Sequence, residues 1–116
     1  MRRGEIRIVE FDPGRGSEAR KRRPAVIVSN DGANRMAEDL GQGTVTVVPL
    51  TSSTVRVYRF QALLPADRTG LPRDSKAQAE QVRSVDVARV GRMVGALPDD
   101  LSRAVDDALR VHLGLM

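Results

Sequence analysis

Cysteine is absent from this sequence of 116 residues, and aromatic side chains make up only 3% of it. The lack of cysteine excludes disulfides, thiolate metal sites and cysteine nucleophiles. With so few aromatics, we expect a core built from Val, Leu, Ala and Ile. No apolar run approaches the ~20 residues that span a membrane, and residues 1–5 (MRRGE) lead into no apolar segment of a secretory signal. We therefore expect a soluble protein of the cytoplasm.

Acidic residues are outnumbered by basic ones, 15 against 19, so the formal net charge is +4 and the pI is near 10.6. Seventeen of the basic residues are arginine. Residues 99–113 hold four acidic and two basic residues, whereas the rest of the chain holds eleven acidic and seventeen basic ones. The length fits one domain over residues 1–116, and the positive charge of its main part favours an anionic partner.

The stretch 22–31 (RRPAVIVSND) places two arginines directly before an apolar, β-branched run. This run predicts a buried strand over residues 24–29, because Val and Ile suit a pleated sheet and Asn-Asp ends it. Pro24 is tolerated as a first strand residue, where its missing N–H costs little. Arg23 is then held at the start of a rigid element, where its planar guanidinium can donate to two phosphate oxygens. The alternative is an ordinary arginine at a strand edge.

Short apolar segments separated by turn residues recur along the chain and predict β strands. Helical spacing appears only at the end, where Leu101, Ala104, Val105, Ala108 and His112 share one face. This combination predicts a mainly β (α+β) fold, a small curved sheet or barrel with a C-terminal amphipathic helix. The expected strands are residues 4–11, 24–29, 44–50, 55–64, 74–81 and 90–96, with a short helical turn in 31–39, the helix in 99–113, and polar connections at 12–22, 51–54 and 65–73.

Several motifs occur in a definite order over nearly the whole chain. They are Arg3-Gly4-Glu5-Ile6, Gly16-Ser17-Glu18, residues 23–31, Val48-Pro49-Leu50-Thr51-Ser52, Asp74-Ser75 and Glu80-Gln81-Val82-Arg83-Ser84, followed by the terminal helix. In order and spacing the chain resembles the MazF/PemK family of toxin endoribonucleases. It departs from that family at Arg7, where Tyr or Trp is usual, and at Arg59, where proline is frequent.

The resemblance implies an SH3-like small β-barrel closed by a C-terminal helix, and a homodimer. It also implies metal-independent, sequence-specific cleavage of single-stranded RNA without a cofactor, and a cognate MazE-like antitoxin that occludes the RNA groove. In that family the arginine before the strand proline and the threonine after the third strand are catalytic, and here these are Arg23 and Thr51. The glutamate of the first loop, here Glu18, contributes in some members.

This chemistry suits the residues present. RNA is cleaved when its own 2′-hydroxyl attacks the adjacent phosphate, which leaves a 2′,3′-cyclic phosphate and a 5′-hydroxyl. Arg23 can stabilise the developing charge, and the Thr51 hydroxyl can donate to a phosphoryl oxygen. Glu18 is the candidate proton acceptor, because arginine is a poor base. His112 is the only histidine, and its predicted apolar face favours core or interface packing instead.

Polar and basic residues around Arg23 and Thr51 are expected to bind the substrate. The run 20–22 (RKR) would attract the RNA backbone, whereas Asp74, Ser75 and Gln81 would read the edges of unstacked bases. The expected RNA-binding residues are Ser17, Arg20, Lys21, Arg22, Asn30, Ser52, Asp74, Ser75, Gln81 and Arg83.

Other interpretations stay open at this point. Residues 51–54 (TSST) also fit an ordinary turn, in which hydroxyls bind backbone groups. A toxin with the same barrel can inhibit DNA gyrase without catalysis, as CcdB does, but such a protein has no use for the pair Arg23 and Thr51. A degenerate member would bind RNA or antitoxin without cleaving, and the departures at Arg7 and Arg59 keep this alternative open.

Overall fold

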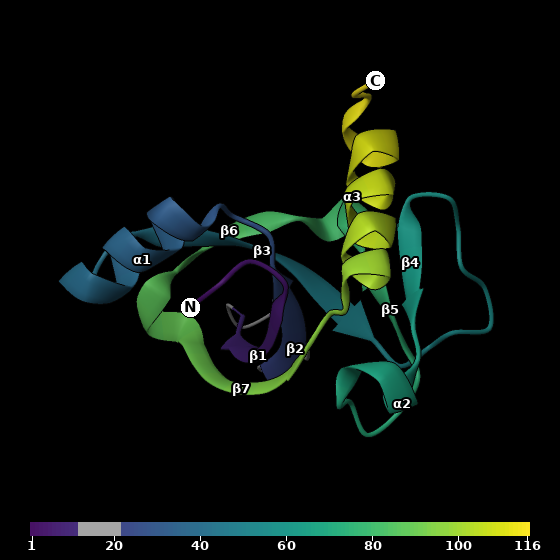
Figure 1. The fold of residues 1–116 in the computed structure, drawn as a ribbon, viewed down its shortest axis with the longest axis horizontal. Helices are drawn as coiled ribbons and strands as arrows, with labels where there is room; N and C mark the ends of the chain where they lie inside the picture. Colours follow the sequence, from purple (N-terminus) through teal and green to yellow (C-terminus); the bar gives the residue numbers. More distant parts are fainter. Residues whose placement is uncertain (12–21) are drawn as a thin grey trace, which may run out of the picture.

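A computed structural model describes residues 1–11 and 22–116. In this part of the chain, seven strands form one antiparallel sheet in the order β4-β5-β3-β2-β1-β7, with β6 also paired to β3. The sheet curls so that β1, β2, β3 and β7 wrap around a common centre, while β4, β5 and α3 stand to one side (Figure 1). The predicted fold class, a barrel-like mainly β domain with a C-terminal helix, is thus confirmed. The strands are β1 (Glu5–Glu10), β2 (Arg22–Ile27), β3 (Thr44–Thr51), β4 (Gln61–Leu64), β5 (Ser75–Gln78), β6 (Arg83–Asp86) and β7 (Val90–Ala96); the helices are α1 (Asp31–Leu40), α2 (Ala66–Thr69) and α3 (Asp99–Leu113), with 3-10 turns η1 (Ala79–Gln81) and η2 (Val87–Arg89).

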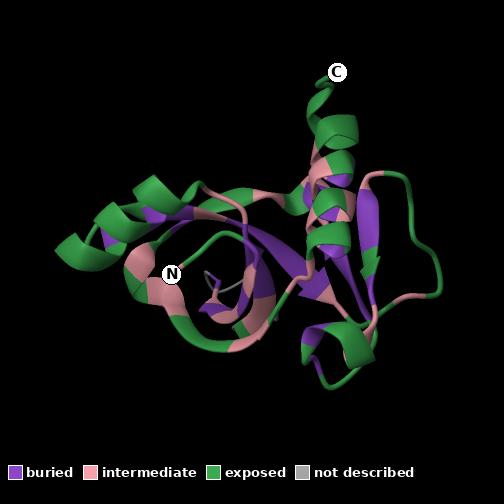
Figure 2. Cartoon of the chain, in the orientation of Figure 1, coloured by how far each residue is buried: buried purple, intermediate pink, exposed green. Residues whose placement is uncertain are grey.

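Two apolar clusters lie on opposite faces of the central strands β2 and β3. Val26 and Val48 belong to the cluster that α3 covers, whereas Ile27 and Val47 belong to the cluster inside the curl. Successive side chains of a strand point to opposite faces, so these strands are buried on both sides (Figure 2) and read as unbroken apolar runs. Complete burial of one such side chain contributes about 1.5–3 kcal/mol. The core consists of Val, Leu, Ala and Ile as expected, and among the described residues Phe11 is its only aromatic.

The predicted strand over 55–64 is wrong in its first half. Only β4 is a strand there, paired with β5 over four residues. The preceding residues alternate in polarity but meet no partner strand, and Val55 is fully exposed. This segment is instead ordered by side chains, since the Tyr58 and Phe60 rings stack with centroids 5.2 Å apart. Alternation alone therefore does not make a strand where no ladder is available.

Three other elements differ from expectation. The helical turn in 31–39 is a complete ten-residue helix, α1, because the Asn30 side chain accepts a hydrogen bond from the Ala33 N–H and Gly41 ends the helix in the left-handed conformation. The strand expected over 74–81 ends at Gln78, where η1 begins. β6 was not predicted, because its sequence RSVD is polar and buries only Val85.

The terminal helix has the predicted bounds, and Leu101, Val105 and Ala108 are buried. His112 is exposed, so its predicted packing in the core of this chain is wrong. The last turns of α3 extend past the sheet (Figure 1). Among the helices in the described residues, none has both the length and the apolar character needed to cross a membrane.

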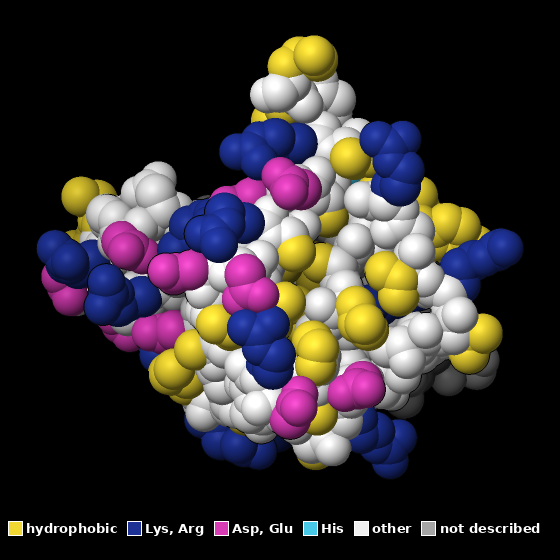
Figure 3. Space-filling model, turned by 45° about the vertical axis from the view of Figure 1, so that its right-hand side comes forward, with side chains coloured by type: hydrophobic (Ala, Val, Ile, Leu, Met, Phe, Trp, Pro, Cys, Tyr) yellow, Lys and Arg dark blue, Asp and Glu magenta, His cyan; other side chains and the backbone are white. Residues whose placement is uncertain are grey.

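The surface carries charges of both signs. Basic and acidic side chains are interspersed over the face seen in Figure 3, and hydrophobic side chains gather at the C-terminal tip of α3. Leu115 and Met116 lie at this tip and are exposed.

Candidate active site

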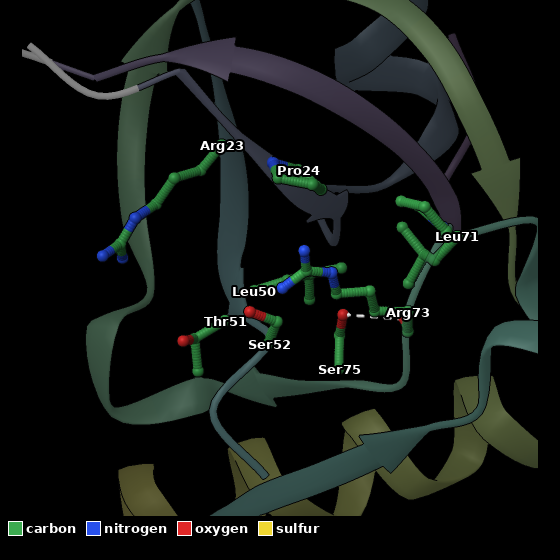
Figure 4. A pocket seen from close by; sticks show the side chains of 9 residues that line it. Arg23, Pro24, Leu50, Thr51, Ser52, Leu71, Arg73 and Ser75 are labelled. Carbon is green, nitrogen blue, oxygen red and sulfur yellow. Dashed lines mark hydrogen bonds between the residues drawn. The ribbon is translucent and has the colours of Figure 1, made fainter.

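The start of β2 and the end of β3 meet at a pocket of about 370 Å³. The two strands are antiparallel, with Ala25 opposite Pro49. Arg23, near the start of β2, and Thr51, at the end of β3, line this pocket together. A third segment, residues 71–75, closes the pocket from the β5 side. The pocket is lined by Arg23, Pro24, Leu50, Thr51, Ser52, Leu71, Pro72, Arg73 and Ser75 (Figure 4).

The pocket has an apolar floor and a basic, hydroxyl-bearing rim. Leu50 and Leu71 belong to the main core cluster, so the floor is rigid. Arg23 and Thr51 are half-buried, where charge interactions are stronger than in bulk water. The Thr51 Oγ1 atom accepts a hydrogen bond from the Ser53 N–H at 3.3 Å. Its own proton stays available for donation to a ligand oxygen.

The positive charge of the pocket lining points to an anionic ligand. The described residues of the lining contribute two guanidinium groups, from Arg23 and Arg73, and no carboxylate. Arginine donates in a planar fork that matches phosphate oxygens. The pair of residues singled out from the sequence, Arg23 and Thr51, thus lies in one positively charged pocket together with Ser52 and Ser75.

Comparisons with known proteins agree with this geometry. A family model described as PemK-like, MazF-like toxin of type II toxin-antitoxin system matches residues 2–113. The chain belongs to this family. It is 54% identical over 115 residues to endoribonuclease MazF9 of Mycobacterium tuberculosis, covering 99% of this chain and 98% of that protein. It is also 61% identical to the probable endoribonuclease MazF1 of the same organism over 57 residues, 49% of this chain and 61% of that protein.

Solved structures of MazF proteins share the fold. The Mycobacterium tuberculosis toxin MazF-mt6 superposes with a TM-score of 0.78 at 23% identity, covering 97% of this chain and 98% of that one. MazF from Deinococcus radiodurans gives 0.77 at 27% identity, with 99% and 97% covered. A MazE-MazF structure from the same organism gives 0.76 at 26% identity, with 100% and 98% covered.

The other RNA-binding candidates of this MazF-family chain are distributed over several surfaces. Arg22 does not face the pocket: with Ile8 and Arg92 it lines a separate hollow of about 450 Å³, because adjacent strand residues point to opposite faces. Gln81 lies exposed in η1. The Arg83 guanidinium stands over the Phe11 ring, 5.3 Å from its centroid. The candidates Ser17, Glu18, Arg20 and Lys21 lie outside the described residues.

Two candidates have structural partners in the folded chain. The Asn30 side chain caps α1, as described above. The Asp74 carboxylate accepts a hydrogen bond from the Ala66 N–H at 2.8 Å and so stabilises the start of α2. Each of them is therefore held in place by backbone contacts, and their roles in binding RNA stay predictions.

Arg73 is a pocket residue that the sequence did not single out. The available signal was a basic residue directly before the Asp74-Ser75 motif. Only the fold shows that residues 71–75 lie against the ends of β2 and β3. Among the described residues, no group of three or more His, Asp or Glu side chains is placed to hold a metal ion.

An ion pair outside the pocket supports the segment that carries Arg73. Arg68 of α2 donates two hydrogen bonds of 2.8 Å to the two carboxylate oxygens of Asp100 in α3. The hydrogen bond from Arg68 lowers the pKa of the Asp100 carboxyl, and the same bond raises the pKa of Arg68. The pair joins α2 to α3 just before the chain enters the pocket.

Proposed function

We propose that this chain cleaves single-stranded RNA in the pocket that contains Arg23 and Thr51. The chain is an endoribonuclease toxin of the MazF family, and a cognate antitoxin neutralises it. The observation that carries the assignment of the site is the meeting of Arg23 and Thr51, from two strands, in a pocket whose described lining has no negative charge. Sequence-specific RNA cleavage by such a site inhibits translation and growth.

The proposed reaction is an internal transesterification. The ribose 2′-oxygen forms a bond to the neighbouring phosphorus, and the bond from phosphorus to the 5′-oxygen breaks. One product ends in a 2′,3′-cyclic phosphate and the other begins with a 5′-hydroxyl. Arg23 stabilises the extra negative charge of the phosphorane, and Thr51 donates to a phosphoryl oxygen. The site positions both on strand ends, so little reorganisation is needed.

The reaction also moves two protons. A base takes the proton of the 2′-hydroxyl, and an acid supplies one to the departing 5′-oxygen. We assign the first role to Glu18, which lies outside the described residues. If Glu18→Gln cleaves RNA at the rate of the unmodified protein, then Glu18 is not the base. The mechanism we propose needs no metal or cofactor.

The remaining RNA contacts follow from the surfaces around the pocket. Ser52 and Ser75 lie inside it. We assign Ser75, Asp74 and Gln81 to base recognition, and Ser52 to contact with the RNA. We assign Arg20, Lys21, Arg22 and Arg83 to contacts with the RNA backbone, with Ser17 and Asn30 as further contacts.

We also propose that residues 1–116 form one domain and that two chains form a homodimer. The antitoxin that we propose is MazE-like and covers the RNA groove, and the protein acts in the cytoplasm.

The decisive experiment is cleavage of a long RNA of mixed sequence in EDTA by the unmodified protein and by Arg23→Ala, with both ends of each cut sequenced. We expect cuts at a short recurring motif with 5′-hydroxyl ends, made by the unmodified protein alone. Arg103→Ala is the matched control, because Arg103 is exposed on α3 and its loss changes the charge equally. Binding without cleavage by folded protein would indicate the degenerate alternative, and inhibition of supercoiling would indicate a gyrase inhibitor.

A further inference from the structure

We propose that Arg73 binds the RNA phosphate adjacent to the scissile one, so that the pocket holds two successive phosphates of the strand. The inference rests on the proposed function, and it adds a positioning residue to that function. The volume of about 370 Å³ lies in the range of pockets that enclose a small organic molecule and exceeds what one phosphate fills. The pocket thus has room for a nucleotide unit between its two arginines.

The backbone that carries Arg73 is held from both sides. Leu71 is anchored in the core at 5% exposure. Asp74 is tied to the start of α2 through the Ala66 N–H. The buried Ser75 donates its hydroxyl hydrogen to the carbonyl oxygen of Arg73 at 3.2 Å. The guanidinium therefore projects from a fixed support, which lowers the entropic cost of binding a ligand.

Arg73 also has no partner for its charge within residues 1–11 and 22–116. Some arginines of this fold do have a carboxylate partner: Arg68 binds Asp100, and Arg3 binds Asp106 at 2.7 Å. The nearest carboxylate in sequence, Asp74, is engaged with the backbone of α2. An arginine that is left unpaired in a pocket with a second arginine creates a local positive potential, and a polyanion relieves it.

The two guanidinium groups enter the pocket from different elements. In Figure 4, Arg23 extends from β2, while Arg73 extends from the segment before β5 and points toward Ser52. Arg23 lies beside Thr51, which takes the reacting phosphate in the proposed function. Arg73 and Ser52 are then placed for the next phosphate, because an RNA strand carries one charge per nucleotide through the site.

The test measures binding of a fluorescent RNA oligomer in which the nucleotide at the cut carries a 2′-deoxy sugar and therefore cannot react. The oligomer carries the motif that the unmodified protein cuts, or a mixed sequence if it cuts none. Neutral methylphosphonates replace its phosphates one at a time. The proteins are unmodified, Arg73→Ala, Arg73→Lys and the charge-matched control Arg103→Ala, each checked by its melting temperature.

We expect Arg73→Ala to weaken binding about 10- to 100-fold, as the loss of a charged hydrogen bond does. Arg73→Lys should recover part of this loss, and Arg103→Ala should bind within about twofold of the unmodified protein, since solvent screens its charge. The slope of log affinity against log salt should fall by about 0.7 for one lost phosphate contact. One methylphosphonate next to the cut should weaken RNA binding by the unmodified protein by a similar factor. The same replacement should have no further effect on RNA binding by Arg73→Ala.

Unchanged RNA binding by Arg73→Ala would overturn the inference. It would also be overturned if each methylphosphonate that weakens RNA binding by the unmodified protein weakened binding by Arg73→Ala equally. A lower cleavage rate without weaker binding would place Arg73 on the reacting phosphate and would also overturn it. In each case cleavage of normal RNA by the unmodified protein would leave the proposed function intact. Failure of the unmodified protein to cleave any RNA would remove the proposed function, and failure to bind any would remove both.

Discussion

Arg22 and Arg23 are chemically identical neighbours with different surroundings. Arg23 is half-buried in the pocket beside Thr51, whereas Arg22 is exposed in a hollow with Ile8 and Arg92. The alternation of a strand accounts for the difference, since it sends the two side chains to opposite faces. A pair of adjacent arginines in the sequence thus provides one guanidinium for the site and one for another surface.

We therefore expect the two alanine substitutions to differ. Arg23→Ala should lower the single-turnover cleavage rate about 100- to 1,000-fold, the usual effect of removing a donor to a developing oxyanion. Arg22→Ala should leave that rate unchanged. It should reduce the slope of log RNA affinity against log salt concentration by about 0.7. Rapid-quench cleavage of a defined RNA at several salt concentrations measures both quantities. Equal losses of rate in the two variants would contradict the assignment.

Thr51 offers a second test at the residue scale. Thr51→Val preserves the shape of the side chain and removes its hydroxyl, so we expect a rate about 100-fold lower. Thr51→Ser keeps the hydroxyl and should retain most of the rate. The valine variant also loses the hydrogen bond that Thr51 Oγ1 accepts from the Ser53 N–H, which costs about 1 kcal/mol of stability. Melting temperatures separate that loss from the chemical one, and a fast Thr51→Val enzyme would exclude Thr51 from catalysis.

Between elements, β7 approaches α2 closely at Gly95. A Cβ atom placed on Gly95 would overlap the carbonyl oxygen of Thr69, which is backbone and cannot turn aside. The chain then passes through Gly70, in the left-handed conformation at φ +86°, into the segment that lines the pocket. The contact of Gly95 with Thr69 thus lies directly before residues 71–75 in the chain.

Gly95→Ala should accordingly separate β7 from α2. We expect the free energy of unfolding to fall by about 3 kcal/mol, as overpacking in a rigid place does, and RNA cleavage to fall with it as residues 71–75 shift. Gly114→Ala is the matched control, because a Cβ atom placed on Gly114 would have nothing within 4 Å and only its left-handed conformation costs about 1 kcal/mol. Urea unfolding measures the free energy of unfolding of both variants. Equal stability of the two variants would refute this account of the packing.

The ion pair between α2 and α3 predicts a dependence on pH. The hydrogen bond from Arg68 lowers the pKa of Asp100 in the folded chain, so the folded state binds this proton less readily than the unfolded state does. The pair stabilises the fold above the ordinary aspartate pKa of about 4, and the contribution disappears as pH falls through the lowered value. Asp100→Asn should thus melt lower than the unmodified protein at pH 7. The difference should shrink as pH falls below about 4, and a constant difference from pH 7 down into this acid range would contradict the linkage.

At the scale of the whole molecule, an apolar surface near the end of α3 is left exposed by the part of the chain that the structure describes. Leu109, Leu113 and Leu115 line a hollow near the end of α3, with Arg3 and Asp106 at its rim. Leu113 and Leu115 are exposed, and clustered apolar surface of this kind is common at contacts between chains. It is the surface on which we expect the proposed homodimer to depend.

Sedimentation equilibrium should accordingly give the mass of two chains for the unmodified protein. Leu113→Glu places a charge in the hollow and should shift the equilibrium toward single chains, since burying the carboxylate is costly. Circular dichroism checks that the variant stays folded. A single-chain mass for the unmodified protein would exclude the homodimer, and a dimeric Leu113→Glu protein would place the contact elsewhere.

The sequence by itself determined the elements whose pattern is local or fully buried. The run 25–28 (AVIV) is apolar on both faces of its strand, and α3 has helical spacing with an acidic first turn, so both were predicted with nearly correct bounds. The ordered motifs likewise identified the family, which the match over residues 2–113 confirms. For the strand and the helix the deciding information lies within a few neighbouring residues, and for the family it lies in the order of the motifs along the chain.

Tertiary structure alone decided the features that depend on partners distant in sequence. Residues 55–60 alternate in polarity like a strand, yet within the described residues they pair with no other strand. The polar segment β6 is a strand because it pairs with β3. His112 is exposed near the end of α3, where the helix extends beyond the sheet (Figure 1). Arg73 belongs to the pocket because folding brings residues 71–75 to the ends of β2 and β3, far away in sequence. Hydrogen-bonded ladders and close packing are properties of segments brought together by folding, so no local pattern contains them.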